Sequence, residues 1–346
     1  GGTDMSFHRS GIVLTDEVAC HIMSNWAEAE NKACKKTWDH VFCRGDNKIG
    51  EREKRIAQAF AILEKRATSS DVLSKELTQI YAWLKTPDDP GFTDHLYISR
   101  VEYCNFGNSK PFRIRVVNRY NDNHDYYYVK RADASRIYGL ELEHILAPNR
   151  IDFLVQGNPL VEEHIAGVPG DVFLKNRDLD TEHTRIRIAK EFVKFSERCF
   201  VKLLGDMRSY NYVVVITRDF DMDQIRVRAI DFDQQSYEGN IQVYLPQFYE
   251  ENQTMVDLVW NVLDPASIRQ YQKEERSLIA RRMRTAWSRV DDLLYCMEQD
   301  EISTPDRVEQ LAAGLGRYHH DEDFRESRKM GQLTRHHLTT MVTEDE

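Results

Sequence analysis

The sequence predicts an α+β protein in which an antiparallel sheet is followed by a mainly helical part. Between residues 96 and 165, short runs of β-branched and aromatic residues alternate with turn-forming residues, as in strands. From residue 182 onward, most apolar residues recur at helical spacing. The segment "TPDDPGF", residues 86–92, contains two prolines and a glycine and therefore indicates a boundary. We expect a helical N-terminal unit (1–92), a sheet lobe (93–165) and a helical lobe (166–346).

Two helices are expected in the N-terminal unit. In "EREKRIAQAFAILEKRA", residues 51–67, the apolar side chains form one stripe, and "SSDVLSKELTQIYAWLK", residues 69–85, has the same pattern. Ser70 or Asp71 is suited to cap the second helix. These helices could offer a docking surface for a protein partner.

The sheet lobe is predicted to contain three strands, a helix and two further strands. "LYISRVEYC", "PFRIRVVNRY" and "DYYYVKRA" are joined by turn-like segments and predict an antiparallel meander. "ASRIYGLELEHILA" predicts a helix that ends before Pro148. The strands "RIDFLVQ" and "PLVEEHI" follow, around the turn at 157–159.

The helical lobe is predicted to contain one strand hairpin among its helices. A helix over 182–204 leads to Gly205, and strands over 212–217 and 225–232 come next. Further helices are expected at 252–263, from Pro265 to about Gln299, and from near Pro305, where a proline can occupy the first turn.

Composition excludes several classes of protein. A net charge of -10 argues against a main role in nucleic-acid binding, which needs clustered cations. No run of about twenty apolar residues predicts a membrane span. The start lacks the pattern of a secretory signal, so we expect a cytoplasmic protein, although a secreted effector without such a signal would have the same features. The six scattered cysteines predict no disulfide framework, and the pairs His319-His320 and His336-His337 are expected to face solvent.

Three polar residues form the candidate chemical site. Asp206 and Asn211 lie five positions apart in "GDMRSYN", just before one strand of the hairpin, and Asp231 follows the other strand. Phosphoryl transfer needs metal ions that neutralise the phosphates and a carboxylate that orients the attacking hydroxyl. Carboxylate and amide oxygens are the ligands that Mg²⁺ prefers. The spacing therefore predicts a magnesium and nucleotide site.

This arrangement resembles the protein-kinase-like superfamily, with motifs most similar to aminoglycoside and choline kinases. The resemblance implies a bilobal fold, with Asp206 as the catalytic acid-base residue and Asn211, Asp231 and Asp233 as magnesium ligands. It also implies that Lys130 meets the phosphates of ATP. The partner of Lys130 would be Glu143, with Glu141 on the same helix as the alternative.

The resemblance places the nucleotide as well. The backbone of Glu163 and Ile165 would face the adenine, and Gly107 and Asn108 of "NFGNSK" would lie over the phosphates. The chain departs from the protein-kinase pattern at Leu204 and Gly205, where a histidine and an arginine usually precede the catalytic aspartate.

We therefore expect an ATP- and magnesium-dependent phosphotransferase that acts on a hydroxyl, most simply of a small molecule. One alternative keeps the fold but makes the acceptor a protein, as in an atypical protein kinase or a nucleotidyltransferase effector. Another is a pseudokinase scaffold that binds a nucleotide or nothing and works through its helical flanks.

Overall fold

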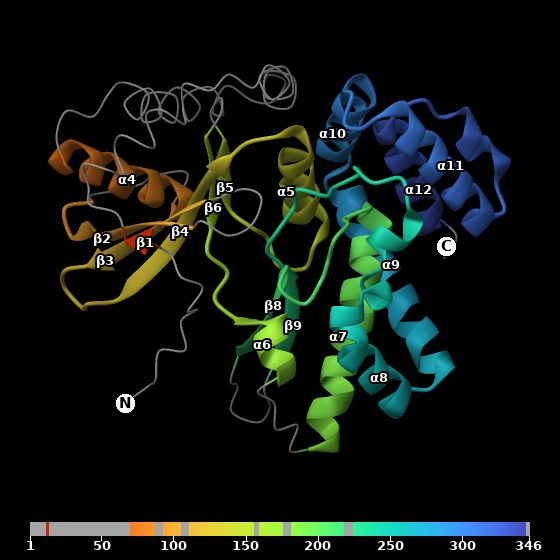
Figure 1. The fold of residues 1–346 in the computed structure, drawn as a ribbon, viewed down its shortest axis with the longest axis horizontal. Helices are drawn as coiled ribbons and strands as arrows, with labels where there is room; N and C mark the ends of the chain where they lie inside the picture. The colour runs from red at the N-terminus through yellow and green to blue at the C-terminus, as the bar shows by residue number, and fades with distance from the viewer. Residues whose placement is uncertain are drawn as a thin grey trace. The chain divides into compact units, whose positions relative to one another are not determined.

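The structure is a computed structural model that describes residues 12–13, 70–86, 93–104, 111–155, 159–175, 181–217 and 224–343 (Figure 1). These residues form two compact units. The sheet unit holds the described residues up to Asp133 together with Ile151–His164, and the helical unit holds Ala134–Arg150 and the described residues from Ile165 onward. The helix expected at 51–67 and the loop residues Gly107 and Asn108 lie outside the described residues.

The sheet unit contains an antiparallel sheet with the order β1-β2-β3-β4-β6-β5. The expected meander and the two later strands are confirmed. The strands are β1 (Ile12–Val13), β2 (Leu96–Tyr103), β3 (Phe112–Asn118), β4 (His124–Arg131), β5 (Phe153–Val155) and β6 (Pro159–Glu163).

One face of this sheet packs against helix α4 (Ser70–Lys85), which confirms the expected second helix. Alternate residues along each strand supply the core, as the two-residue period of a strand requires. Ile114, Tyr127 and Val161 are fully buried there together with Leu77 and Ile80 of α4. Since α4 shares this core, it is part of the same compact unit as the sheet.

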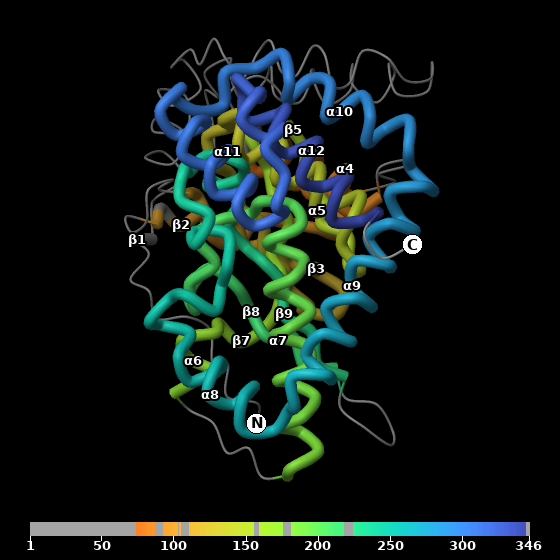
Figure 2. Tube along the Cα trace, turned by 90° about the vertical axis from the view of Figure 1, so that its right-hand side faces the viewer, coloured from red at the N-terminus to blue at the C-terminus, as the bar shows by residue number. Residues whose placement is uncertain are grey.

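The helical unit is built around α7, which lies alongside α9 and β9 (Figures 1 and 2). It contains one short antiparallel sheet, ordered β7-β8-β9. Its elements are α5 (Ala134–Leu146), β7 (Val168–Pro169), α6 (Gly170–Lys175), α7 (Glu182–Lys202), β8 (Tyr212–Thr217), β9 (Gln224–Ala229), η1 (Ile241–Tyr244), η2 (Pro246–Phe248), η3 (Glu250–Asn252), α8 (Gln253–Val262), α9 (Pro265–Thr285), α10 (Trp287–Gln299), α11 (Pro305–His319), η4 (Glu322–Glu326) and α12 (Met330–Thr343).

Helix α5 groups with the helical unit, although the expected sheet lobe ran from 93 to 165 without interruption. Its polar side chains explain this grouping. Tyr138 donates a hydrogen bond to Asp300, 3.0 Å away, and Glu141 accepts one from Arg289 at 2.6 Å. Both partners belong to the helical unit.

Two expectations for the helical unit are wrong. The helix predicted from Pro265 to Gln299 is broken at Ala286, because α9 packs against α7 while α10 packs mainly against α12 and α5. His337 is fully buried, whereas we expected it to face solvent. Its Nε2 donates to the carbonyl of Phe200, and its Nδ1 lies 2.9 Å from His319 Nε2.

None of the helices in the described part of the chain is long and apolar enough to cross a membrane. The thiols of Cys104, Cys199 and Cys296 are all buried, Cys104 in the sheet unit and the other two in the helical unit.

Candidate functional site

The loop that carries Asp206 begins where α7 ends. Leu203 adopts the left-handed conformation, with φ of 54°, and turns the chain away from the helix. Gly205 then donates its N–H to the carbonyl of Gln234. A Cβ at Gly205 would lie 2.9 Å from Val243 Cγ1 and 3.0 Å from Gln234 O, so the close approach requires glycine. This packing explains why Gly205 stands directly before Asp206.

Asp206 is held in one orientation by its own loop. Its φ of 57° lies in the left-handed region, which aspartate tolerates better than most residues. Its N–H donates to Val243 O at 3.1 Å, and its carboxylate accepts from Arg208 Nε at 2.8 Å. The side chain is half-buried, so the carboxylate is both oriented and accessible.

Asn211 is hydrogen-bonded to Asp206. Its Nδ2 donates to Asp206 O at 2.7 Å and to Asp206 Oδ2 at 3.2 Å. These two acceptors fix the orientation of the amide and direct Asn211 Oδ1 away from Asp206. The backbone carbonyl of Asn211 accepts from Ile230 N–H at 3.0 Å, which places Asn211 beside the residue that precedes Asp231.

Asp231 lies at the same end of the β8-β9 hairpin as Asn211. The register pairs Tyr212 with Ala229, so the chain enters β8 at Asn211 and leaves β9 toward Asp231 at one end. The Asp231 Oδ1 accepts from the N–H of Phe232 at 2.9 Å, and no lysine or arginine among the described residues pairs with this carboxylate. Asp231 therefore retains acceptor capacity for a cation.

The donor set at this end of the hairpin fits magnesium. Among the described residues, no three His, Cys, Asp or Glu side chains are grouped so as to hold a metal ion by themselves. Mg²⁺ seldom needs such a group, because in nucleotide sites it is bound by one or two protein ligands plus phosphate oxygens and water. Asn211 Oδ1 and the Asp231 carboxylate are the groups that could form that smaller set, and their role as metal ligands stays a prediction.

Asp233 differs from Asp231 in its environment. Its carboxylate lies 3.4 Å from the guanidinium of Arg136 on α5. This ion pair connects the segment after β9 to α5 within the helical unit. The role of Asp233 as a metal ligand stays a prediction.

Arg208 and two of its contacts were not predicted from the sequence. The Arg208 Nη1 donates to Glu251 Oε1 at 2.8 Å, and its guanidinium lies 5.0 Å from the ring centre of Tyr249. The hydrogen bonds that Arg208 donates to Asp206 and Glu251 raise the pKa of Arg208. Arg208 lies only two residues after Asp206, so this contact is local in sequence. Glu251 of η3 is 43 residues from Arg208, so no local pattern in the sequence indicates that contact.

In the sheet unit, Lys130 pairs with Glu162. The Lys130 Nζ lies 2.8 Å from Glu162 Oε2, and both side chains are more than nine-tenths buried. Glu162 continues a row of polar residues in register across the strands, from Glu102 through Arg113 and Tyr128. This row lies on the face opposite to the apolar core, because its members alternate with the core residues.

The two glutamates proposed for Lys130 have cationic partners of their own in the helical unit. Glu143 Oε2 accepts from Lys202 Nζ, and Glu141 Oε2 accepts from Arg289. Sequence reasoning missed Glu162 as a partner because cross-strand neighbours become visible only once the register is known.

Glu163 and Ile165 stand on either side of the division between the units, which falls after His164. The side chain of Glu163 bonds to Lys85 Nζ at 3.3 Å and to the N–H of Asp152 at 3.2 Å. In the described part of the chain, no hydrogen bond engages the backbone N–H or C=O of Ile165.

No protein-family model matches this chain, and none of the curated proteins matches it.

Proposed function

We propose that this protein is an ATP- and magnesium-dependent phosphotransferase that transfers a phosphoryl group to a hydroxyl. The observation that carries the proposal is the joint geometry of Asp206, Asn211 and Asp231. One carboxylate is oriented by its loop, the amide oxygen is directed away from it, and the other carboxylate has no cationic partner among the described residues. Phosphoryl transfer uses such groups.

The architecture supports the same proposal. An α+β chain with three antiparallel strands, a helix and two more strands, followed by helices and a hairpin, has the element order that the kinase-like resemblance implies. The loop with Asp206 precedes β8, and Asp231 follows β9, as that resemblance requires.

Asp206 would orient the acceptor hydroxyl and take its proton as the oxygen attacks the terminal phosphorus of ATP, while the bond from that phosphorus to the bridging oxygen breaks and ADP leaves. Arg208 donates a hydrogen bond to that carboxylate and holds it in place. Asn211 and Asp231 would hold magnesium, which when bound neutralises the phosphate oxygens. The kinase-like resemblance also assigns Lys130 to the phosphates of ATP, and in this structure Lys130 pairs with Glu162.

The test is thermal unfolding of the protein with ATP and magnesium and with ATP alone, compared with Asp231→Ala and Asp306→Ala. Asp306 is an exposed aspartate in the first turn of α11 and controls for the loss of charge. Saturation at a hundredfold over Kd adds about 2.7 kcal/mol of stability, a shift of a few degrees. We expect a magnesium-dependent shift that Asp231→Ala abolishes and Asp306→Ala preserves. The absence of any shift in the unchanged protein would contradict the proposal.

A nucleotide-binding scaffold without transfer is the second candidate. The Lys130–Glu162 pair favours it, because the expected glutamates of α5 bond to other cations. Labelled ATP separates the two candidates. Label transferred to metabolites or to protein in a cell extract supports the phosphotransferase and identifies the class of acceptor, whereas binding without transfer supports the scaffold.

A further inference from the structure

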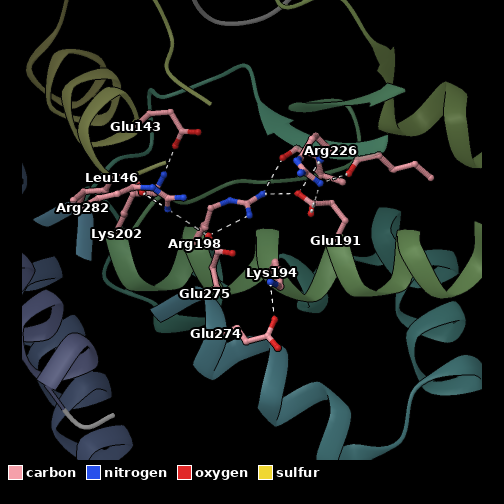
Figure 3. Close-up of polar contacts among 12 residues, drawn as sticks. Glu143, Leu146, Glu191, Lys194, Arg198, Lys202, Arg226, Glu274, Glu275 and Arg282 are labelled. Atoms are coloured by element: carbon pink, nitrogen blue, oxygen red, sulfur yellow. Dashed lines mark hydrogen bonds and ion pairs between the residues drawn. The ribbon is translucent and has the colours of Figure 1, made fainter. Parts of the chain in front are cut away.

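A buried group of charged side chains lies along one side of α7. Glu191, Arg198 and Lys202 of this helix are each at least nine-tenths buried (Figure 3). Their partners come from other helices of the same unit. Lys202 pairs with Glu143 of α5, and Arg198 Nη1 lies 3.4 Å from Glu275 of α9.

The group pairs each buried carboxylate with at least one cation. Glu191 lies 3.0 Å from Arg198 Nη2, and two more distant arginines complete the group, with Arg282 Nη1 3.9 Å from Glu275 and Arg226 Nη1 3.9 Å from Glu191. Burial lowers the pKa of Arg198, but Glu191 and Glu275 raise it by more, so the guanidinium stays charged. Removing one member would leave an opposite charge buried without compensation.

Two members of the group bond directly to the backbone of β9. Arg198 Nη2 donates to Val227 O at 3.0 Å, and Glu191 Oε1 accepts from Val227 N–H at 3.3 Å. Arg198 Nη2 also donates to Glu191 Oε1 at 3.0 Å. Since β9 is at the edge of its sheet and β8 lies on its other side, this ion pair takes the place of a neighbouring strand.

Strand β9 and helix α7, which this ion pair joins, lead to Asp231 and Asp206 of the candidate site. Asp206 follows α7 directly, four residues after Lys202, and Asp231 lies four residues after Val227. A helix is rigid along its axis, so a contact between α7 and β9 limits how far these two segments can move relative to one another.

We propose that Glu191 and Arg198 are positioning residues that set the place of Asp231 relative to Asp206. This inference rests on the proposed function. The geometry predicts that a change at Glu191 weakens the use of magnesium more than it weakens acceptor binding, because Asp231 is a metal ligand in that proposal and Asp206 meets the hydroxyl.

A matched control exists between the same two helices. Lys194 of α7 lies 2.9 Å from Glu274 of α9, and this more exposed pair is linked to no strand in the described contacts. Glu191→Gln and Glu274→Gln remove the same charge, but only the first removes it from the group that holds β9.

The experiment measures, in both variants and the unchanged protein, the magnesium concentration that gives half of the ATP-dependent rise in Tm. The KM of an acceptor found by labelling is measured as well. We expect Glu191→Gln to raise the magnesium requirement by about tenfold, as for other groups that orient metal ligands. Glu274→Gln should stay within about twofold of the unchanged protein, and KM for the acceptor should change by less than the magnesium requirement.

Equal magnesium requirements in the two variants would overturn the inference, and so would equal changes in magnesium requirement and KM in Glu191→Gln. If Glu191→Gln shows no cooperative unfolding, Arg198→Lys replaces it, because lysine keeps the charge but cannot supply both guanidinium edges. The absence of a magnesium-dependent shift in the unchanged protein would instead contradict the proposed function.

Discussion

Arg198 and Arg208 lie ten residues apart, and each contacts two carboxylates, yet their surroundings differ. Only 5% of the Arg198 side chain is exposed, and it bonds to Glu191, Glu275 and the backbone of β9. Arg208 is 38% exposed, and it bonds to Asp206 in its own loop and to Glu251 of η3. Exposure decides what each arginine can do, because a buried ion pair fixes structure whereas a half-exposed one can exchange its partner for a ligand.

The largest effect, on the rate of transfer, is expected at Asp206, the carboxylate that half-exposed Arg208 contacts. Asp206→Asn keeps the size and the left-handed preference of the residue but cannot accept a proton, so transfer should fall by about a thousandfold or more. The measurement is the rate of transfer to an acceptor from labelled ATP. A rate within tenfold of that of the unchanged protein would assign the proton transfer to another group.

The next effect tests the buried arginine. Arg198→Met leaves Glu191 and Glu275 without their main cation, and the free energy of unfolding should fall by about 3–5 kcal/mol. Urea unfolding measures this change, with Lys194→Met as the control on the same helix. A loss below about 1 kcal/mol for Arg198→Met would show that burial does not distinguish the two arginines.

His337 tests whether burial also fixes the charge state of a histidine, a residue whose ordinary pKa lies near neutral pH. Burial, with a smaller repulsion from His319, lowers the pKa of His337 to about 3. The unfolded chain binds the proton near pH 6.5, so acidification below that value favours unfolding. The stabilising contribution of neutral His337 is fully present above about pH 6.5. Below that value the free energy of unfolding should fall by about 1.4 kcal/mol per pH unit toward pH 3.

The measurement for His337 is urea unfolding between pH 7 and pH 4.5. His337→Gln keeps a donor for the carbonyl of Phe200 but does not titrate, so its stability should depend less on pH in this range. Parallel curves for the two proteins would contradict a buried neutral imidazole.

The smallest effect on stability is expected at Arg208. Its ion pairs are half-exposed, so Arg208→Gln should change the free energy of unfolding by at most about 1 kcal/mol. Transfer should nevertheless fall by about tenfold or more, because the orientation of Asp206 is lost. A loss of stability as large as that of Arg198→Met would show that Arg208 holds the fold together as Arg198 does.

Local patterns in the sequence predicted much of this fold. The strands, α4, α7 and the hairpin follow from periodicity and turn residues. The break at Ala286 was not predictable, because no proline or glycine marks it and only packing against different helices causes it.

The sequence did not predict which charged residues pair with one another. Glu162 faces Lys130 through the strand register, and Glu251 reaches Arg208 from a turn far along the chain. Buried His337 is similar, since its site is made by Phe200 of α7 and His319 of α11. Such contacts depend on tertiary structure, which single-sequence patterns do not encode.

The buried thiols give the protein internal reporters of its opening. Burial raises the pKa of Cys104 and raises that of Cys199 to about 12, so neither reacts with an alkylating reagent while it is enclosed. The rate of alkylation at each cysteine, read by mass spectrometry of its peptide, then measures how often its surroundings unfold. Since Cys104 lies in the sheet unit and Cys199 in the helical unit, one labelling time course would show whether the two units open together or separately.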